Sequence, residues 1–291
     1  QFFVALTGRA LSRVKRHPWI MEVRDLWPES IKTVGAMNDN VIIRYFEWQE
    51  KRCYNSATKI IVVTDSFKRT LINRGINSNK IEVIKNGVNT TLFTPREKDQ
   101  ILLNSLNLKG KKVIGYIGTH GLAHKLDFVL NCAKSLESYK DIHFLLIGDG
   151  ATKAQLLKLK EDLKCKNVTM LPSVSKNEVA RYISILDVCL INLKKSQLFK
   201  TVIPSKIFEN AGMQKPILMG VEGEAKDIIE SYGAGICFEP ENEFDFKAKL
   251  FQILEPQVYN DCKKGCKKIT EDFDRKTLAK KMLTIINSST R

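Results

Sequence analysis

The chain has 291 residues, 43% of them hydrophobic and 27% charged, which fits a soluble globular α/β protein of one large or two moderate domains. No apolar run approaches the roughly eighteen residues that a membrane-spanning helix needs, so the sequence excludes such a helix. The formal net charge of +15 predicts attraction to phosphates, nucleic acid or anionic lipid headgroups.

Seven cysteines and four histidines are the residues that could hold a soft metal ion. The cysteines form no C-x-x-C pair, which argues against a structural zinc site. Several lie in apolar contexts, such as DVCLI (187–191) and GICFE (235–239). We therefore expect buried free thiols, as in a reducing cytoplasm.

The positive charge is concentrated at the two ends of the sequence. Residues 1–20 carry four basic side chains (Lys or Arg) and no acidic one, and residues 247–291 carry eleven basic and five acidic ones. These basic clusters either contact an anionic membrane or form an ordinary solvated surface, and the sequence favours neither alternative. Aromatic residues are few and are not interleaved with Lys and Arg, so we expect no nucleic-acid partner.

The first part of the chain predicts a small parallel sheet. It opens with Gln1 and an apolar stretch, residues 2–8, that we expect to be strand-like. The absence of an initiator Met and of a signal pattern leads us to expect a fragment whose beginning is missing. Short apolar runs then alternate with amphipathic stretches, as in a sheet covered by helices. The expected strands lie within 19–30, 58–65 and 80–88, and the expected helices within 41–57 and 66–75.

Residues 91–112 are the best candidate for a linker, because the alternation weakens there. A second, longer series of strands and helices follows, and a helical, basic segment begins at Glu243. Roughly seven strands in such an alternation predict an α/β fold with a doubly wound sheet. The strands of this series are expected within 111–118, 142–150, 167–174, 187–193, 216–220 and 234–240.

Two loops at strand ends could bind a ligand. The first, GYIGTHG (115–121), is rich in glycine, which lets the backbone approach a ligand closely. In an open α/β sheet, ligands bind beyond the carboxyl ends of the strands. A helix beginning near Lys125 would direct its free N–H groups at an anion. Glycine-rich strand ends are also common without function, so the loop alone decides nothing.

The second loop is FKTVIPSKIFENAGMQKP (199–216). Ser205 is expected to cap a helix, and Lys206 lies in its first turn, where a cation opposes the helix dipole. A bound phosphate would compensate Lys206, and Glu209, one turn later, could accept hydrogen bonds from two ribose hydroxyls. The alternative is a surface helix with an ordinary Lys and Glu.

Five blocks of sequence resemble bacterial members of glycosyltransferase family 4, retaining enzymes of the GT-B fold that assemble polysaccharides. The combination of DLWPES, GTHG and PSKIFE is most similar to L-fucosamine transferases of the WbuB type, from O-antigen and capsule pathways. The resemblance covers essentially the whole chain. The blocks are RDLWPES (24–30), VIKNGVNTTLFTP (83–95), YIGTHGLAHKLDFVL (116–130), LLIGDG (145–150) and IPSKIFENAGMQKPIL (203–218).

The resemblance implies roles for individual residues. Glu209 matches the second acid of the E-x7-E motif, which binds the ribose, while the first acid is replaced by Thr201. Lys125 lies close to a diphosphate-binding Lys of the family, whose companion Arg is Thr119 here, and Lys206 would supply the missing cation. The residues implied in catalysis are Lys206, Glu209 and Asp25. Those implied in donor binding are Gly118, Thr119, Lys125, Gly148, Asp149, Pro172, Val174, Thr201 and Ser205.

The resemblance also implies a domain organisation. Residues 1–95 would be a partial acceptor-side Rossmann-like domain, 96–275 the donor-binding Rossmann-like domain, and 276–291 a helix that packs back toward the first. A complete acceptor-side domain needs roughly 150 residues. We therefore expect a parent shortened by about a hundred residues, with weak nucleotide binding and poor or absent transfer.

The predicted function is transfer of a sugar, an N-acetylated deoxyhexosamine, from a UDP-sugar to an undecaprenyl-diphosphate-linked saccharide. The enzyme would need no metal or other cofactor and would lie at the inner face of the cytoplasmic membrane. Two alternatives remain open: a non-hydrolysing nucleotide-sugar epimerase, and a non-catalytic module that binds nucleotide sugar or nucleic acid. No His and carboxylate cluster for epimerisation is evident in the loops.

Overall fold

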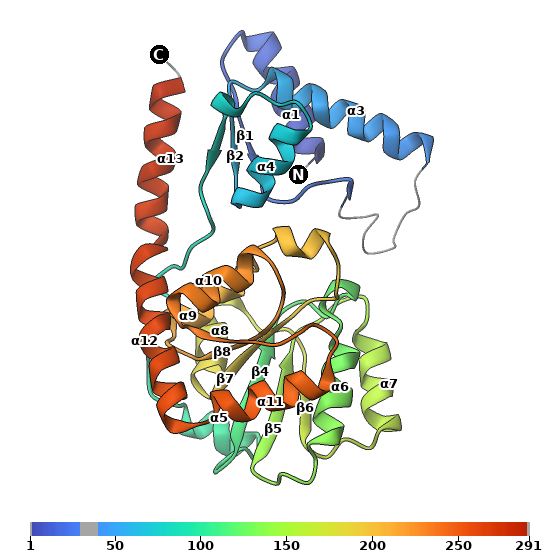
Figure 1. Ribbon diagram of the computed structural model, residues 1–291, viewed down its shortest axis with the longest axis vertical. Helices are drawn as coiled ribbons and strands as arrows, with labels where there is room; N and C mark the ends of the chain where they lie inside the picture. The colour runs from blue at the N-terminus through green and yellow to red at the C-terminus, as the bar shows by residue number, and fades with distance from the viewer. Residues whose placement is uncertain (1, 30–39, 290–291) are drawn as a thin grey trace. The chain divides into compact units, whose positions relative to one another are not determined.

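The computed structural model describes residues 2–29 and 40–289, and the chain divides into two compact units (Figure 1). Unit 1 comprises the described residues up to Asn86, the segment Ser196–Ile203 and the described residues from Arg275 onward. Unit 2 comprises Gly87–Lys195 and Pro204–Asp274. Both units are α/β, as the sequence predicted.

Unit 1 contains a three-stranded parallel sheet in the order β1-β2-β3. Its strands are short and apolar, and Ile60 and Val62 of the central strand are fully buried. Asn40 and Thr64 cap two of the helices with their side chains, each accepting a hydrogen bond from a backbone N–H three residues later. The elements are α1 (Phe2–Lys15), β1 (Ile20–Val23), α3 (Val41–Ser56), β2 (Lys59–Val62), α4 (Asp65–Asn73), η1 (Ser78–Lys80), β3 (Ile81–Val83), η3 (Leu198–Thr201) and α13 (Arg275–Ser289).

The expectation of a strand at residues 2–8 is wrong, because these residues form the first half of α1. Phe2, Ala5 and Arg9 are its buried residues, at spacings of three and four. That spacing places them on one face of a helix, whereas a strand would bury alternate residues.

Unit 2 contains a six-stranded, entirely parallel sheet in the order β6-β5-β4-β7-β8-β9. The chain moves outward from β4 to one edge and then returns to β7, beside β4, before moving to the other edge. The boundary between β4 and β7 is therefore the topological switch point of a doubly wound sheet. The strands are β4 (Lys112–Ile117), β5 (Ile142–Ile147), β6 (Val168–Leu171), β7 (Val188–Asn192), β8 (Ile217–Gly220) and β9 (Gly235–Cys237).

Helices cover both faces of this sheet (Figure 1). All residues of β7 and β8 are buried, as expected for strands between two helical layers. The last helices pack on one another and on the sheet: α11 contacts α6, β8 and β9, and α12 contacts α9, α10 and α11. The helices are α5 (Gln100–Ser105), η2 (Leu122–His124), α6 (Leu126–Ser135), α7 (Lys153–Asp162), α8 (Lys176–Ser184), α9 (Lys206–Gly212), α10 (Glu224–Tyr232), α11 (Glu243–Ile253) and α12 (Pro256–Asp272).

The seven cysteines are free thiols, and six of them are buried. Burial raises the pKa of the Cys189 thiol to about 12, so this thiol stays protonated at neutral pH. Within residues 2–29 and 40–289, no helix has the length and apolar character to cross a bilayer.

Candidate functional site

Two glycine loops of unit 2 lie together beside the switch point. Gly118 directly follows β4, and Gly148 directly follows its neighbour β5. The loops are joined by backbone hydrogen bonds: Gly118 N–H donates to Ile147 O at 2.8 Å, and His120 N–H donates to Asp149 O at 2.8 Å. Gly148 has a φ of 149°, and an added Cβ would overlap the carbonyl oxygen of Gly118. The two loops thus form one close-packed structure that requires glycine.

Lys206, the first residue of α9, reaches this structure from the other side of the switch point. A Cβ added to Gly118 would lie 2.5 Å from both Cε and Nζ of Lys206. The ammonium lies 3.6 Å from the centroid of the Tyr116 ring. The structure therefore brings together two of the residues that the resemblance selected, Gly118 and Lys206, from separate parts of the sequence.

The ammonium of Lys206 is buried without a hydrogen-bond partner. Burial lowers its pKa to about 7, and the nearby charge of Glu209 opposes this shift. Its contact with the Tyr116 ring offers partial compensation, because the face of an aromatic ring attracts a cation. The Tyr116 hydroxyl donates to Thr119 O at 2.7 Å, which fixes the ring against the glycine loop.

The other lysines near these loops are paired. Lys125, with a left-handed φ of 47°, forms a 2.6 Å ion pair with Asp127. Lys153 donates to Gly148 O at 3.0 Å and to Leu171 O at 2.7 Å. Among the lysines that the structure describes, Lys206 is the one whose buried Nζ lacks a partner. Lys206 therefore differs from Lys125, whose charge is already paired within the protein.

The expected cap at Ser205 is wrong. Ser205 has helical backbone angles, and its side chain makes no capping hydrogen bond to α9, a helix of seven residues. The available positive charge at this position is therefore the Lys206 ammonium. Glu209 lies one turn further and is partly buried, close enough to Lys206 to influence its pKa.

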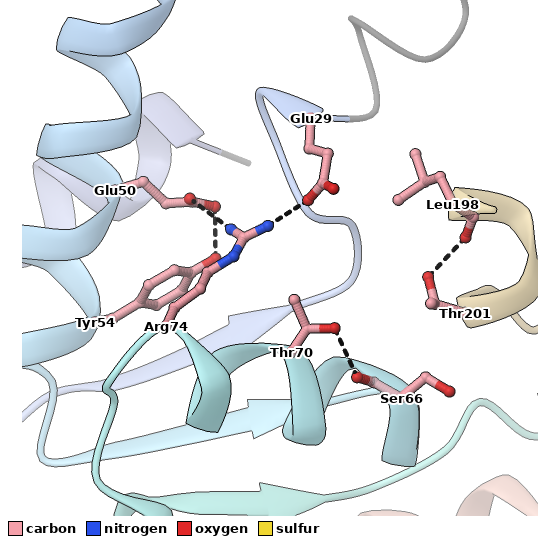
Figure 2. A network of polar contacts seen from close by, with 8 residues as sticks. All are labelled: Glu29, Glu50, Tyr54, Ser66, Thr70, Arg74, Leu198 and Thr201. Carbon is pink, nitrogen blue, oxygen red and sulfur yellow. Dashed lines mark hydrogen bonds and ion pairs between the residues drawn. The ribbon is translucent and has the colours of Figure 1, made fainter.

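The remaining candidates divide between the units. Asp149 follows β5, the neighbour of β4, and Pro172 and Val174 follow β6, the edge strand beyond β5; Asp149 and Pro172 are exposed. Asp25 and Thr201 belong to unit 1. Asp25 is exposed just beyond β1, and the Thr201 hydroxyl donates to Leu198 O at 2.7 Å (Figure 2).

Sequence reasoning missed the buried imidazole of His120. None of its surface is exposed, and neither ring nitrogen has a hydrogen-bond partner. Asn192, the last residue of β7, is also fully buried and donates to His124 O at 2.9 Å, while its carbonyl oxygen has no partner. The sequence carries no local signal for the burial of His120, because that burial depends on the loop that follows β5.

Figure 2 shows a second polar cluster, which lies in unit 1. It lines a cavity of about 500 Å³. Glu50 is 5% exposed and accepts a 2.5 Å hydrogen bond from the Tyr54 hydroxyl. Arg74 contacts Glu50 at 3.5 Å and also pairs with Glu29. Burial raises the pKa of Glu50 to about 7, because the hydrogen bond and the distant guanidinium only partly offset the loss of water. No group of three or more His, Cys, Asp or Glu suited to a metal occurs in the described ranges.

Sequence profiles of two known families match the chain. The profile described as "Glycosyl transferases group 1" matches residues 97–269, and the one described as "Glycosyltransferase Family 4" matches residues 2–92. TuaH of Bacillus subtilis (strain 168), named for glycosyl transfer in teichuronic acid biosynthesis, is 26% identical over 68% of this chain and 49% of its own. WcaI of Escherichia coli (strain K12), named for colanic acid biosynthesis, is 23% identical over 70% and 51%. The chain spans about half the length of these relatives.

Solved structures share the fold. HepE of Anabaena in complex with UDP has a TM-score of 0.83 at 15% identity, covering 99% of this chain and 77% of that one. WaaG, a glycosyltransferase of lipopolysaccharide biosynthesis, has a TM-score of 0.74 at 14% identity, covering 93% and 75%. These likenesses establish the two-domain GT-B fold. Because the group 1 profile matches more than half of its residues, this chain belongs to the glycosyltransferase group 1 family.

Proposed function

We propose that unit 2 binds the diphosphate of a nucleotide sugar through Lys206 and the Gly118 loop, as the donor side of a retaining glycosyltransferase. The observation that carries the proposal is the buried, unpartnered ammonium against Gly118 at the switch point. A buried charge without a partner lowers stability, so its position is best explained by a ligand that completes it. A diphosphate has the opposite charge and several acceptor oxygens.

The chemistry of sugar transfer uses such a cation directly. When the bond between the anomeric carbon and the diphosphate oxygen breaks, negative charge builds on the departing oxygen. A fixed ammonium and backbone N–H groups neutralise that charge, and removing one such group typically slows transfer by about 100- to 1000-fold. Glu209, one turn along α9, would accept hydrogen bonds from the ribose hydroxyls.

The finer identity of the substrates rests on relatives and on the sequence blocks. HepE, which has the same fold, was solved with UDP, and this supports UDP as the nucleotide. TuaH and WcaI are named for teichuronic acid and colanic acid biosynthesis, which supports a role in polysaccharide assembly. The family 4 sequence blocks support a lipid-linked saccharide, carried on undecaprenyl diphosphate, as the acceptor. The WbuB-like motifs favour an N-acetylated deoxyhexosamine, and the basic ends are compatible with contact with the inner face of the cytoplasmic membrane. In this proposal unit 1 is the acceptor side and contributes Asp25, and the epimerase alternative is less well supported.

Calorimetric titration of UDP and uridine tests the diphosphate role. Lys206→Met should weaken UDP binding at least tenfold and leave uridine nearly unchanged, because a hydrogen bond to a charged group contributes about 1.5–3 kcal/mol. Glu209→Ala should weaken both ligands alike, because both contain ribose. Lys215→Met is the matched control: Lys215 is also buried, but its Nζ donates to Ser184 O at 2.7 Å and to Leu186 O at 2.8 Å.

Two results would contradict the proposal. If the natural protein bound UDP and uridine with equal affinity, the site would not bind the diphosphate. An equal loss of UDP and uridine binding in Lys206→Met would assign Lys206 a structural role instead.

A further inference from the structure

His120 has unsatisfied hydrogen-bonding groups in the interior of unit 2. Its ring is fully buried, and both Nδ1 and Nε2 lack a partner. Buried polar groups in folded proteins are nearly always hydrogen-bonded, to protein, water or ligand. The backbone of Ile147 lies close enough to favour the protonated ring, but neither nitrogen forms a well-oriented hydrogen bond, which indicates a partner that the chain itself does not supply.

The position of this ring is fixed by its own backbone. His120 N–H donates to Asp149 O at 2.8 Å, and His120 O accepts from the Thr152 backbone N–H at 3.0 Å and from its hydroxyl at 2.7 Å. A Cβ added to Gly148 would lie 3.1 Å from Cδ2 of the imidazole. Both glycine loops thus hold the ring in place, and its isolation is not the result of a loose surface loop.

The ring lies in the same environment as the Lys206 ammonium. The centroids of the His120 and Tyr116 rings are 6.0 Å apart, and Lys206 Nζ is 3.6 Å from the same Tyr116 centroid. Burial, together with the positive charges of Lys153 and Lys206, lowers the pKa of His120 to about 4, and Asp149 and the backbone of Ile147 oppose the shift. At neutral pH the imidazole is therefore uncharged, with one N–H donor and one acceptor nitrogen.

We propose that His120 is a ligand-contacting residue of the donor site, whose ring N–H donates a hydrogen bond to a phosphate oxygen of the nucleoside diphosphate held by Lys206. The inference rests on the proposed function and adds a second side chain to it. The phosphate draws the Lys206 ammonium off the face of Tyr116, a movement within the flexible stem of the lysine. The space that the ammonium leaves beside the Tyr116 ring then admits a phosphate oxygen.

The bound diphosphate also changes the electrostatics of the ring. Its negative charge opposes the positive charges of Lys153 and Lys206, which together with burial keep the imidazole neutral, and so favours the protonated ring. The pKa of His120 should rise when a diphosphate binds and should stay low when uridine binds. His124 faces the same Tyr116 ring at 5.7 Å, and Lys206 also lowers its pKa, so it should follow His120 to a smaller extent.

Nitrogen NMR of the imidazoles tests this directly, because the protein has only four histidines. The His120 nitrogens should shift on adding UDP or inorganic pyrophosphate, and not on adding uridine. His143 is the internal control: its pKa is also lowered to about 4, mainly by burial, but its Nε2 is hydrogen-bonded to Thr169 Oγ1 at 2.8 Å. Its signals should stay in place with every ligand.

Binding to variants gives the second measurement. His120→Leu should weaken UDP about 10- to 100-fold, since a hydrogen bond to a charged group is lost, and change uridine less than about twofold. His143→Leu should change neither. If His120→Leu fails to fold, the NMR titration of the natural protein still decides.

The outcomes separate this inference from the proposed function. If Lys206→Met loses UDP while the His120 signals and the affinity of His120→Leu stay unchanged, the inference is wrong and the donor site stands. His120 is then a structural residue whose nitrogens bind buried water. If the natural protein does not prefer UDP to uridine, the proposed function fails, and the role of His120 fails with it.

Discussion

In the proposed donor site, the conformation of Lys206 would favour a bound ligand and would cost the free protein stability. Its ammonium is buried beside Gly118, and the Tyr116 ring and the charge of Glu209 compensate it only in part. Unsatisfied polar groups of this kind destabilise a fold, and they concentrate at sites where function requires them. Replacing Lys206 by an apolar residue should therefore raise the stability of the protein and weaken nucleotide binding.

Lys206→Met should stabilise the protein at pH 7 by about 1–3 kcal/mol, the usual penalty of an unsatisfied buried polar group. The pKa of Lys206 is lowered to about 7 in the folded protein, so the unfolded chain binds more protons above that pH. The stability of the natural protein should therefore rise between about pH 7 and 10.5, and the advantage of the variant should shrink. Urea unfolding at pH 7 and pH 10 measures both effects.

Lys215→Met is the control for this measurement. Because the Lys215 ammonium donates to two backbone carbonyl groups, its removal leaves those acceptors unpaired and should destabilise the protein. A loss of stability in both variants would show that the Lys206 ammonium is satisfied in solution and that its burial needs no ligand.

At the residue scale, the sequence selected Lys206 as a candidate but not His120. The Pro-Ser-Lys segment drew attention to Lys206, because a cation in a first helical turn is locally unfavourable. The burial of His120 depends on the loop after β5, about thirty residues further along the chain, which closes over it. Such a contact has no local signature. The prediction that the Ser205 side chain caps α9 was wrong for the opposite reason. Serine locally favours such a position, but in the folded protein Ser205 has helical backbone angles and its side chain makes no capping hydrogen bond.

The two glycine loops act as one element, and Gly148 is its most constrained position. Gly148→Ala would place a Cβ against Gly118 O at a φ of 149°. We expect a loss of about 3 kcal/mol or more, from backbone strain and overlap together. UDP binding should weaken as well, because Gly118 would have to move. Thermal unfolding and UDP titration measure the two effects.

Gly233→Ala is the matched control. Gly233 also has a positive φ, 63°, at the end of α10, but an added Cβ would meet nothing within 4 Å. Only the backbone penalty of about 1–2 kcal/mol remains, with no effect on UDP. Similar losses in both variants would mean that the two loops are not closely interlocked.

At the element scale, the parallel strands were predictable because β-branched and apolar runs between helices have few alternative structures. The α/β fold with its doubly wound sheet is confirmed. The error at residues 2–8 arose where an apolar run fits either a strand or a helix, and only its length decides. There the sequence continues to Lys15 without a break, which favours the helix.

At the scale of the whole molecule, the two units should respond to pH in opposite directions. In unit 1 the pKa of Glu50 is raised from 4.5 to about 7, so the folded state binds more protons, and stability should fall as pH rises through that window. In unit 2 the pKa values of His120, His124 and His143 are lowered from 6.5 to about 4. There the unfolded state binds more protons, and stability should rise between about pH 4 and 6.5.

Hydrogen exchange, resolved by peptide and corrected for the intrinsic rate, should therefore show protection of the β2 region decreasing from pH 4.5 to 6.5, while that of the β4 and β5 region increases. Glu50→Gln should abolish the loss of stability of unit 1 with rising pH, a loss of up to about 3 kcal/mol. The amide can still accept a hydrogen bond from Tyr54 but no longer ionises. The profile of unit 2 should be unchanged in this variant. Parallel pH profiles in the two units of the natural protein would mean that burial does not set these pKa values, and the electrostatic basis of both sites would have to be revised.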